Sequence, residues 1–193
     1  MTGVQTCALP IFLAGGLPGG AIVGTKAILD GLDFQAASLN GGEKVQHQGT
    51  FNANPVSAAA GVAALHIIAT TDACERANAA AASLRAGVND LFEQEGVPWA
   101  YYGEFSSLHL FTNPEGLDIT PTAFDPLALS TAQLLATSAD ALHKFRLAML
   151  VNGIDMNPRC GGVLSAAHDS DDISLTVSAL GRAIEMLRQE NLL

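Results

Sequence analysis

The sequence predicts an α/β segment followed by a small α+β domain, with the boundary near residue 70. The first part combines apolar runs around a Gly-rich turn with an Ala-rich, nearly uncharged helical pattern. The second part alternates amphipathic helical patterns with short β patterns, which is typical of helices packed on one face of a small sheet. A hydrophobic fraction of 49% and a charged fraction of 15% over 193 residues supply enough apolar surface for a packed core.

The first part begins with residues 12–24, FLAGGLPGGAIVG, which predict a strand, a tight turn and a second strand or loop. A short helix is expected over 25–32. Asn54-Pro55 then opens a longer helix, because asparagine caps free amides and proline suits the first helical position. Residues 56–69 are apolar around the whole helix, which predicts burial on several sides.

The second part begins with a helix near Asp72, where Glu75 stands three residues on as a capping pair. Strands are expected over 99–102 and 107–112, followed by an irregular Pro-rich loop over 113–128. A third helix is expected over 131–151, and short strands over 154–156 and 162–166.

The last helix has the clearest pattern, because apolar residues recur at alternating spacings of four and three. These residues are Ile173, Val177, Leu180, Ile184 and Leu187. The acidic residues at its start, Asp169, Asp171 and Asp172, suit the positive end of a helix dipole. They lack the glycine and distant glutamate of a calcium loop, and no histidine pair has metal-ligand spacing, so no metal site is expected.

The charge balance excludes two classes of partner. The formal net charge is −10, with only nine lysines and arginines in total, so we expect neither nucleic acid nor an anionic membrane to bind. No apolar stretch approaches the roughly 20 residues that span a bilayer. The three cysteines are far apart, which indicates neither a zinc site nor a redox dithiol and predicts a cytoplasmic protein.

The start of the chain fits poorly with the rest of the sequence. Residues 1–11, MTGVQTCALPI, have neither the basic start nor the apolar core of a signal peptide. They resemble translated sequencing-adapter read-through, and we expect them to be a non-native leader.

The segment 46–55, QHQGTFNANP, places a Gly-Thr pair just before the capped helix. The amide of Gly49 and the hydroxyl of Thr50 suit an anion such as phosphate at a helix start. The same residues also fit a simple turn with a helix cap.

Four segments, in order and at matching spacing, resemble the class III aminotransferases, and most of all their glutamate-1-semialdehyde aminomutase branch. The matching segments are 12–21 (FLAGGLPGGA), His47-Gln48-Gly49-Thr50-Phe51 with Asn54-Pro55, Gly103 with Ser106, Ser107, His109 and Phe111, and Asn152-Gly153-Ile154-Asp155 followed by Ser165-Ala166-Ala167-His168 and Asp172-Ile173.

The resemblance implies a fold-type-I transferase that uses pyridoxal 5'-phosphate (PLP) and acts on a small amino substrate. Residues 12–70 would be the C-terminal remnant of the PLP-binding large domain, and residues 71–193 the small C-terminal α+β domain. Gly49 and Thr50 would contact the PLP phosphate of the neighbouring subunit. A homodimer with a shared cofactor site is therefore implied.

The resemblance also exposes a difference at the catalytic position. The family places its PLP-binding lysine where this chain has Ile11, and isoleucine supplies no amine. We therefore expect a truncated chain that is inactive as it stands. The alternative is a non-catalytic fragment or dimerisation module.

A second difference concerns specificity. The aminomutase branch has a glutamate before its Ser-x-Ala-His segment, whereas residues 156–164 here contain no acid. Plain transamination is thus an alternative to a 1,2-amino shift. Arg159 lies in this interval and is expected either to bind a substrate carboxylate bidentately or to form a surface salt bridge.

Overall fold

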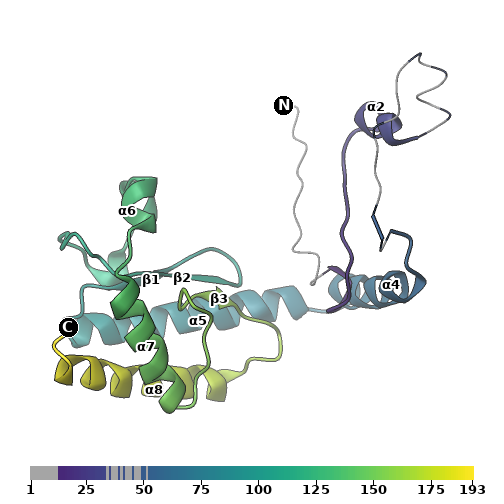
Figure 1. Cartoon of the computed structure of the whole chain (residues 1–193). Coiled ribbons are helices and arrows are strands. Elements are labelled where there is room, and N and C mark those ends of the chain that lie inside the picture. Colours follow the sequence, from purple (N-terminus) through teal and green to yellow (C-terminus); the bar gives the residue numbers. More distant parts are fainter. Residues whose placement is uncertain are drawn as a thin grey trace. The chain divides into compact units, whose positions relative to one another are not determined.

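The computed structural model describes residues 13–33, 35, 39, 41, 45, 49, 50 and 52–193. The chain divides into two compact units, one that ends at Thr71 and one from Asp72 to Leu193. Figure 1 labels the helices and strands of the two units.

The first unit contains α2 (Lys26–Leu29), the 3-10 turn η1 (Asp30–Leu32) and α4 (Pro55–Thr70). The start of α4 is as predicted: Asn54 Oδ1 accepts from the amides of Val56 and Ser57 at 3.0 and 3.1 Å. The short helix expected over 25–32 is also confirmed.

Two expectations for this unit are wrong. Residues 13–24 form a turn and extended chain without strand pairing, because a strand requires a neighbour and the described part of this unit provides none. The predicted burial of 56–69 also fails. Ser57 is the one buried residue of α4, whereas Val56, Val62 and Ile67 are 65%, 70% and 54% exposed.

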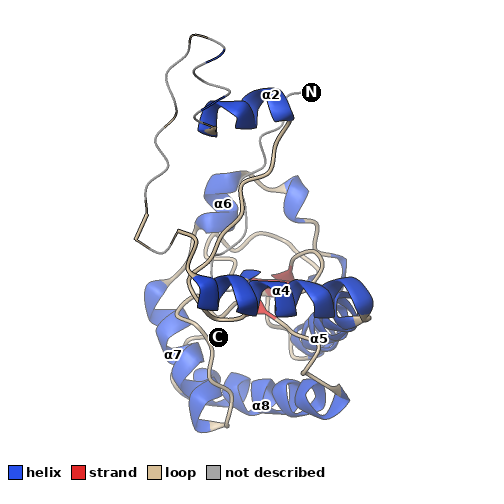
Figure 2. Ribbon diagram, turned by 90° about the vertical axis from the view of Figure 1, so that its right-hand side faces the viewer, coloured by secondary structure: helices blue, strands red, loops and turns tan. Residues whose placement is uncertain are grey.

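The second unit is an α+β fold with a three-stranded antiparallel sheet in the order β1-β2-β3. Figure 2 shows the small sheet and the helices that surround it. In chain order its elements are α5 (Ala73–Gln94), β1 (Ala100–Tyr102), β2 (Ser107–Phe111), the 3-10 turns η2 (Pro121–Ala123) and η3 (Pro126–Ala128), α6 (Thr131–Leu135), α7 (Ala139–Val151), β3 (Gly162–Val163) and α8 (Ser170–Gln189).

Helices α5 and α8 lie side by side and run parallel (Figure 1). Near their starts the guanidinium of Arg76 donates to the carbonyl of Ala166 at 3.4 Å. At their ends Arg188 pairs with Glu95 at 2.6 Å. The dipoles of parallel neighbouring helices repel each other. Charged residues at the two ends of α8 offset this repulsion: Asp171 and Asp172 lie in its first turn and Arg188 in its last turn.

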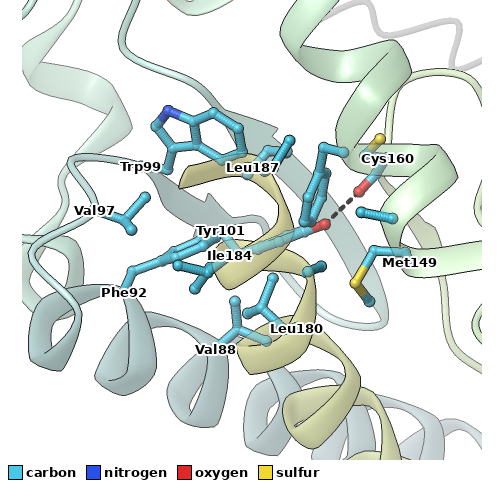
Figure 3. Packing of buried hydrophobic residues seen from close by; sticks show 14 of the residues in the cluster. Val88, Phe92, Val97, Trp99, Tyr101, Met149, Cys160, Leu180, Ile184 and Leu187 are labelled. Carbon is cyan, nitrogen blue, oxygen red and sulfur yellow. Dashed lines mark hydrogen bonds between the residues drawn. The ribbon is translucent and has the colours of Figure 1, made fainter. Parts of the chain in front are cut away.

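The core fills the space between the sheet and helices α5, α7 and α8 (Figure 3). Tyr101, Leu108 and Leu110 point from the sheet into this core, as the alternation of a strand requires. On the opposite face, the rings of Tyr102 and Phe111 pack against Phe124 from the loop, at 5.7 and 5.0 Å between centroids. The prediction of helices on one face of a small sheet is therefore confirmed.

Several local predictions in this unit are wrong. Asp72 does not form the expected cap, because its carboxylate accepts from Arg76 Nε at 3.0 Å instead. The helix expected over 131–151 is broken into α6 and α7, and Ser138 caps the second piece.

The strand predictions after α7 also need correction. Residues 154–156 form no strand, since the carbonyl of Met156 accepts from Arg146 Nε at 2.6 Å rather than from a strand. The strand expected over 162–166 shortens to Gly162–Val163. The last helix is confirmed, with a capping box between Asp169 and Asp172.

Among the described residues, no single helix is long and apolar enough to cross a membrane.

Candidate functional site

The Gly49–Thr50 pair stands in a turn just before α4. The amide of Asn52 donates to the carbonyl of Gly49 at 3.0 Å, which closes the turn. A Cβ placed on Gly49 would lie 2.7 Å from Asn52 Oδ1, so a larger residue here would require the Asn52 side chain to move. Gly49 and Thr50 are both exposed, whereas the neighbouring His47 and Phe51 of the motif lie outside the described residues.

A hollow of about 620 Å³ lies beside this turn, within the first unit. Its wall includes Ala14, Gly19, Asn52, Asn54 and Ser57. The motif that begins at residue 12 and the Asn-Pro helix start therefore meet at one place.

The wall of this hollow depends on the Gly-rich turn. Gly15 and Gly16 have φ angles of +58° and +94°, in agreement with the predicted tight turn. The amide of Leu17 donates to the carbonyl of Ala14 at 3.1 Å. A Cβ on Gly19 would lie 2.7 Å from the Cβ of Ala14, so the chain packs too closely there for a side chain.

Sequence reasoning missed Ser57 as a residue of this hollow. Its side chain is 9% exposed and lines the wall, and its amide is bound by Asn54. The apolar periodicity of α4 carries no signal for it, but its place one turn into a capped helix does.

The chemistry of this region suits an anion bound by neutral donors. The amides of Val56 and Ser57 at the start of α4 donate to Asn54 Oδ1, and the helix dipole there favours negative charge. Lys26 of the same unit is paired with Asp30 at 2.8 Å. The predicted neutral donors to phosphate are the amide of Gly49 and the hydroxyl of Thr50.

The second unit carries Arg159 on an exposed loop. The guanidinium of Arg159 has no hydrogen-bond acceptor or acidic partner among the described residues, so the salt-bridge alternative for it is not realised. Every other arginine of the described chain has an acceptor. These engaged arginines are Arg76, Arg85, Arg146, Arg182 and Arg188.

Beneath this loop lie two buried titratable groups. Burial raises the pKa of the Tyr101 phenol well above its usual value. Burial likewise raises the pKa of the Cys160 thiol to about 11, although the charge of Arg146 opposes this shift. Both groups are therefore neutral near neutral pH, and Tyr101 acts as a hydrogen-bond donor.

No group of three or more potential metal ligands occurs among the described residues. Asp169 and Asp172 instead form the cap of α8. The predicted phosphate contacts and Arg159 belong to different units of the chain.

The model of the family Aminotransferase class-III matches residues 8–102. A glutamate-1-semialdehyde 2,1-aminomutase from Polaromonas naphthalenivorans is 30% identical over 177 residues, which cover 91% of this chain and 36% of that protein. These matches support a class III aminotransferase that is similar to the glutamate-1-semialdehyde aminomutases. The chain spans about a third of the length of the curated relatives that it matches.

Solved structures agree with the family. An omega-transaminase from Sphaerobacter thermophilus is 27% identical with a TM-score of 0.71, covering 91% of this chain and 37% of the other. A β-phenylalanine aminotransferase from Variovorax paradoxus is 26% identical with a TM-score of 0.69, covering 92% and 37%. A transaminase with PLP bound shares the fold at 23% identity and a TM-score of 0.72, covering 93% and 37%. The expected relation to fold-type-I PLP enzymes is confirmed, and PLP is the cofactor of the family.

Proposed function

We propose that this chain forms the carboxylate-recognising and phosphate-contacting part of a PLP-dependent aminotransferase. Its substrate would be a small amino compound that carries a carboxylate. The proposal rests on the guanidinium of Arg159, which is exposed and has no partner in the described part of the chain. The other described arginines all have hydrogen-bond acceptors.

Arg159 suits this role because a planar guanidinium binds a carboxylate through two parallel hydrogen bonds. The chain has 19 acidic residues against nine basic ones, so an arginine without an acidic partner is unexpected unless another anion uses it. Lysine would supply a point charge without the paired donors.

PLP, when bound, supplies the electron sink that aminotransferase chemistry needs. The Gly49 amide and the Thr50 hydroxyl would donate to its phosphate across a homodimer interface, through charge-assisted hydrogen bonds. The described residues fit this task, because the turn leaves both Gly49 and Thr50 exposed to solvent.

Ile11 limits what this chain can do by itself, because it stands where the family has its catalytic lysine. The family lysine both anchors the cofactor and moves protons, and an isoleucine side chain does neither. We infer that the 193-residue chain does not catalyse transamination by itself. A cytoplasmic location and the absence of nucleic-acid and membrane partners remain predictions.

Transamination is favoured over an amino shift by the loop that carries Arg159. The interval 156–164 contains an arginine and no acid. The proposal therefore departs from the aminomutase name of its curated relatives, and an aminomutase activity is the competing outcome.

The decisive experiment uses the protein encoded at the genomic locus, if its reading frame has a lysine before Phe12. Arg159→Ala should raise KM for amino donors with a carboxylate at least tenfold, since a charged hydrogen-bonded pair contributes roughly 1.5–3 kcal/mol. Amines of similar size without a carboxylate should keep their KM. An equal loss for both donor classes, or a locus without that lysine, would overturn the proposal.

A second function is favoured by the exposed apolar side chains of α4. They suit a chain that associates through this helix without catalysis. PLP titration of the purified chain tests this second function. A borohydride-trappable PLP adduct at one defined lysine would contradict a non-catalytic chain; Lys26 and Lys44 are the nearest amines in the sequence.

A further inference from the structure

The loop of residues 155–162, the Arg159 loop, is held by side chains of other elements on both sides of Arg159. On one side, Arg146 donates from Nε to the carbonyl of Met156 at 2.6 Å and pairs with Asp155 at 3.5 Å. On the other side, the hydroxyl of Tyr101 donates to the carbonyl of Cys160 at 2.6 Å (Figure 3). Both anchors come from elements outside the loop.

The tip of the Arg159 loop is held from within by Asn157. Its Oδ1 accepts from the amides of Arg159 and Gly161, at 2.8 and 3.4 Å. The amide of Cys160 also donates to the carbonyl of Asn157 at 2.9 Å. The backbone of Arg159 is therefore bound at its own amide and at the two residues after it.

The conformation of Cys160 shows that these bonds hold the loop against a local preference. Its φ is +55°, a left-handed value that costs a non-glycine residue roughly 1 kcal/mol. Such strain persists where the surroundings fix it. Here the fixing contacts are the Tyr101 hydrogen bond and complete burial of the Cys160 side chain.

Close packing fixes the exit of the loop. A Cβ on Gly161 would lie 2.5 Å from the carbonyl oxygen of Leu108, so only glycine fits. Gly162 then pairs with Leu108 in the sheet. A hollow of about 180 Å³ lies beside the loop. Its wall includes Asn157 and Gly161, which flank Arg159, the apolar side chains of Met156 and Leu164, and the acidic residues Asp155 and Asp172.

From this geometry we infer that Tyr101 and Asn157 are positioning residues that preorganise Arg159 for a carboxylate ligand with an apolar body. The inference rests on the proposed role of Arg159. A loop fixed before binding loses less conformational freedom on binding, which raises affinity without a new contact. The carboxylate would meet the guanidinium, and the apolar body would occupy the hollow beside the loop.

The test uses the full 193-residue chain and nuclear magnetic resonance of the arginine Nε–H groups. The probes are 3-phenylpropanoate and its amide, which has the same body but no charge. For the wild type we expect a saturable shift of the Arg159 Nε–H signal with the acid and none with the amide. Arg159→Lys should abolish binding of the acid.

Loop variants then isolate positioning. Because apparent affinity follows the population of the binding-competent state, Tyr101→Phe and Asn157→Ala should each raise the Kd about three- to tenfold. Tyr102→Phe is the matched control, since it removes from the same strand a hydroxyl that has no hydrogen-bond acceptor in the described part of the chain. Amide spectra outside the loop confirm that each variant is folded.

The outcomes separate the two proposals. If the wild type gives no saturable shift of Arg159, both the role of Arg159 and its positioning are overturned. If the wild type binds and both loop variants bind equally well, the positioning inference fails while the proposed role of Arg159 stands. Weakened binding in both loop variants, with Tyr102→Phe unchanged, supports positioning.

Discussion

The side chain of Asn89 takes the place of a neighbouring strand for the main chain of Tyr101. Asn89 Oδ1 accepts from the Tyr101 amide at 2.7 Å, and Asn89 Nδ2 donates to the Tyr101 carbonyl at 2.9 Å. Strand β1 is an edge of the sheet, and its outer backbone groups would otherwise lack partners. One residue of α5 thus closes the edge and joins helix to sheet.

Replacement of Asn89 by leucine should lower the free energy of unfolding by about 2 kcal/mol, because two partly buried backbone groups lose their partners. Chemical denaturation of the purified chain measures this change. Asn78→Leu on the same helix is the control and should change stability by less than about 0.5 kcal/mol. Equal losses in both variants would contradict the role of Asn89.

The apolar rhythm of the chain was sufficient to predict the second unit. Helix α8 has its predicted face buried at Leu180, Ile184 and Leu187, because a 3.6-residue period reports directly on burial. Strands β1 and β2 were likewise predictable from their alternation. Asn89 was not, since a polar residue on a helix gives no sign of which distant backbone it binds.

The failures have a common physical cause, which is competition from side-chain contacts that local patterns do not reveal. Asp72 has the composition of a cap, but Arg76 takes its carboxylate. Residues 154–156 have β propensity, but Arg146 binds the carbonyl of Met156. At the candidate site, Gly49, Thr50 and Arg159 came from resemblance, and their roles stay proposals. The sequence could not show that Arg159 lacks a partner. The structure shows it, because every other described arginine has a hydrogen-bond acceptor.

The hydroxyl of Thr112 is buried and has no hydrogen-bond partner in the described part of the chain. Thr112→Val keeps the shape and removes the unsatisfied group, so it should stabilise the chain by about 1 kcal/mol. Thr112→Ser keeps the hydroxyl and removes the methyl group, and should destabilise it by a similar amount. Thermal unfolding of both variants checks the prediction, and a Thr112→Val variant less stable than the wild type would sink it.

Stability should fall at alkaline pH because of Cys160. Its folded pKa of about 11 lies above the usual value, so the unfolded chain releases this proton first. The contribution is complete below the unfolded pKa and is lost as pH rises toward the folded one. Between about pH 8 and pH 10 we expect a loss of about 1–2 kcal/mol from this thiol.

The measurement is the slope of unfolding free energy against pH, compared with Cys160→Ala. The variant should lose this part of the slope, whatever its absolute stability. Burial raises the pKa of Tyr101 as well, so Tyr101 adds its own alkaline slope to both the wild type and the variant. Identical slopes would show that Cys160 ionises freely in the folded chain. Exposed Cys74 should meanwhile react with thiol reagents long before buried Cys160.

The break between α6 and α7 gives a prediction with a definite sign. Ser138 Oγ accepts from the amide of Ala141 at 3.3 Å and caps α7. Loss of such a cap in Ser138→Ala should destabilise the chain by about 1 kcal/mol. In an unbroken helix the same change would stabilise it by a few tenths of a kcal/mol, because alanine is the better helix former. Chemical denaturation therefore separates a capped break from a continuous helix.

The exposed side of α4 predicts self-association of the chain. Val56, Val62 and Ile67 are more than half exposed, and the helix carries no charged residue over its length. Since contiguous apolar surface drives association in water, we expect dimers or larger species by light scattering. Val62→Glu should shift the chain toward the monomer, whereas Leu127→Glu, at a 91% exposed apolar position in the second unit, should not. A monomeric wild-type chain would refute the role of α4, and equal dissociation by both variants would show that added charge alone is responsible.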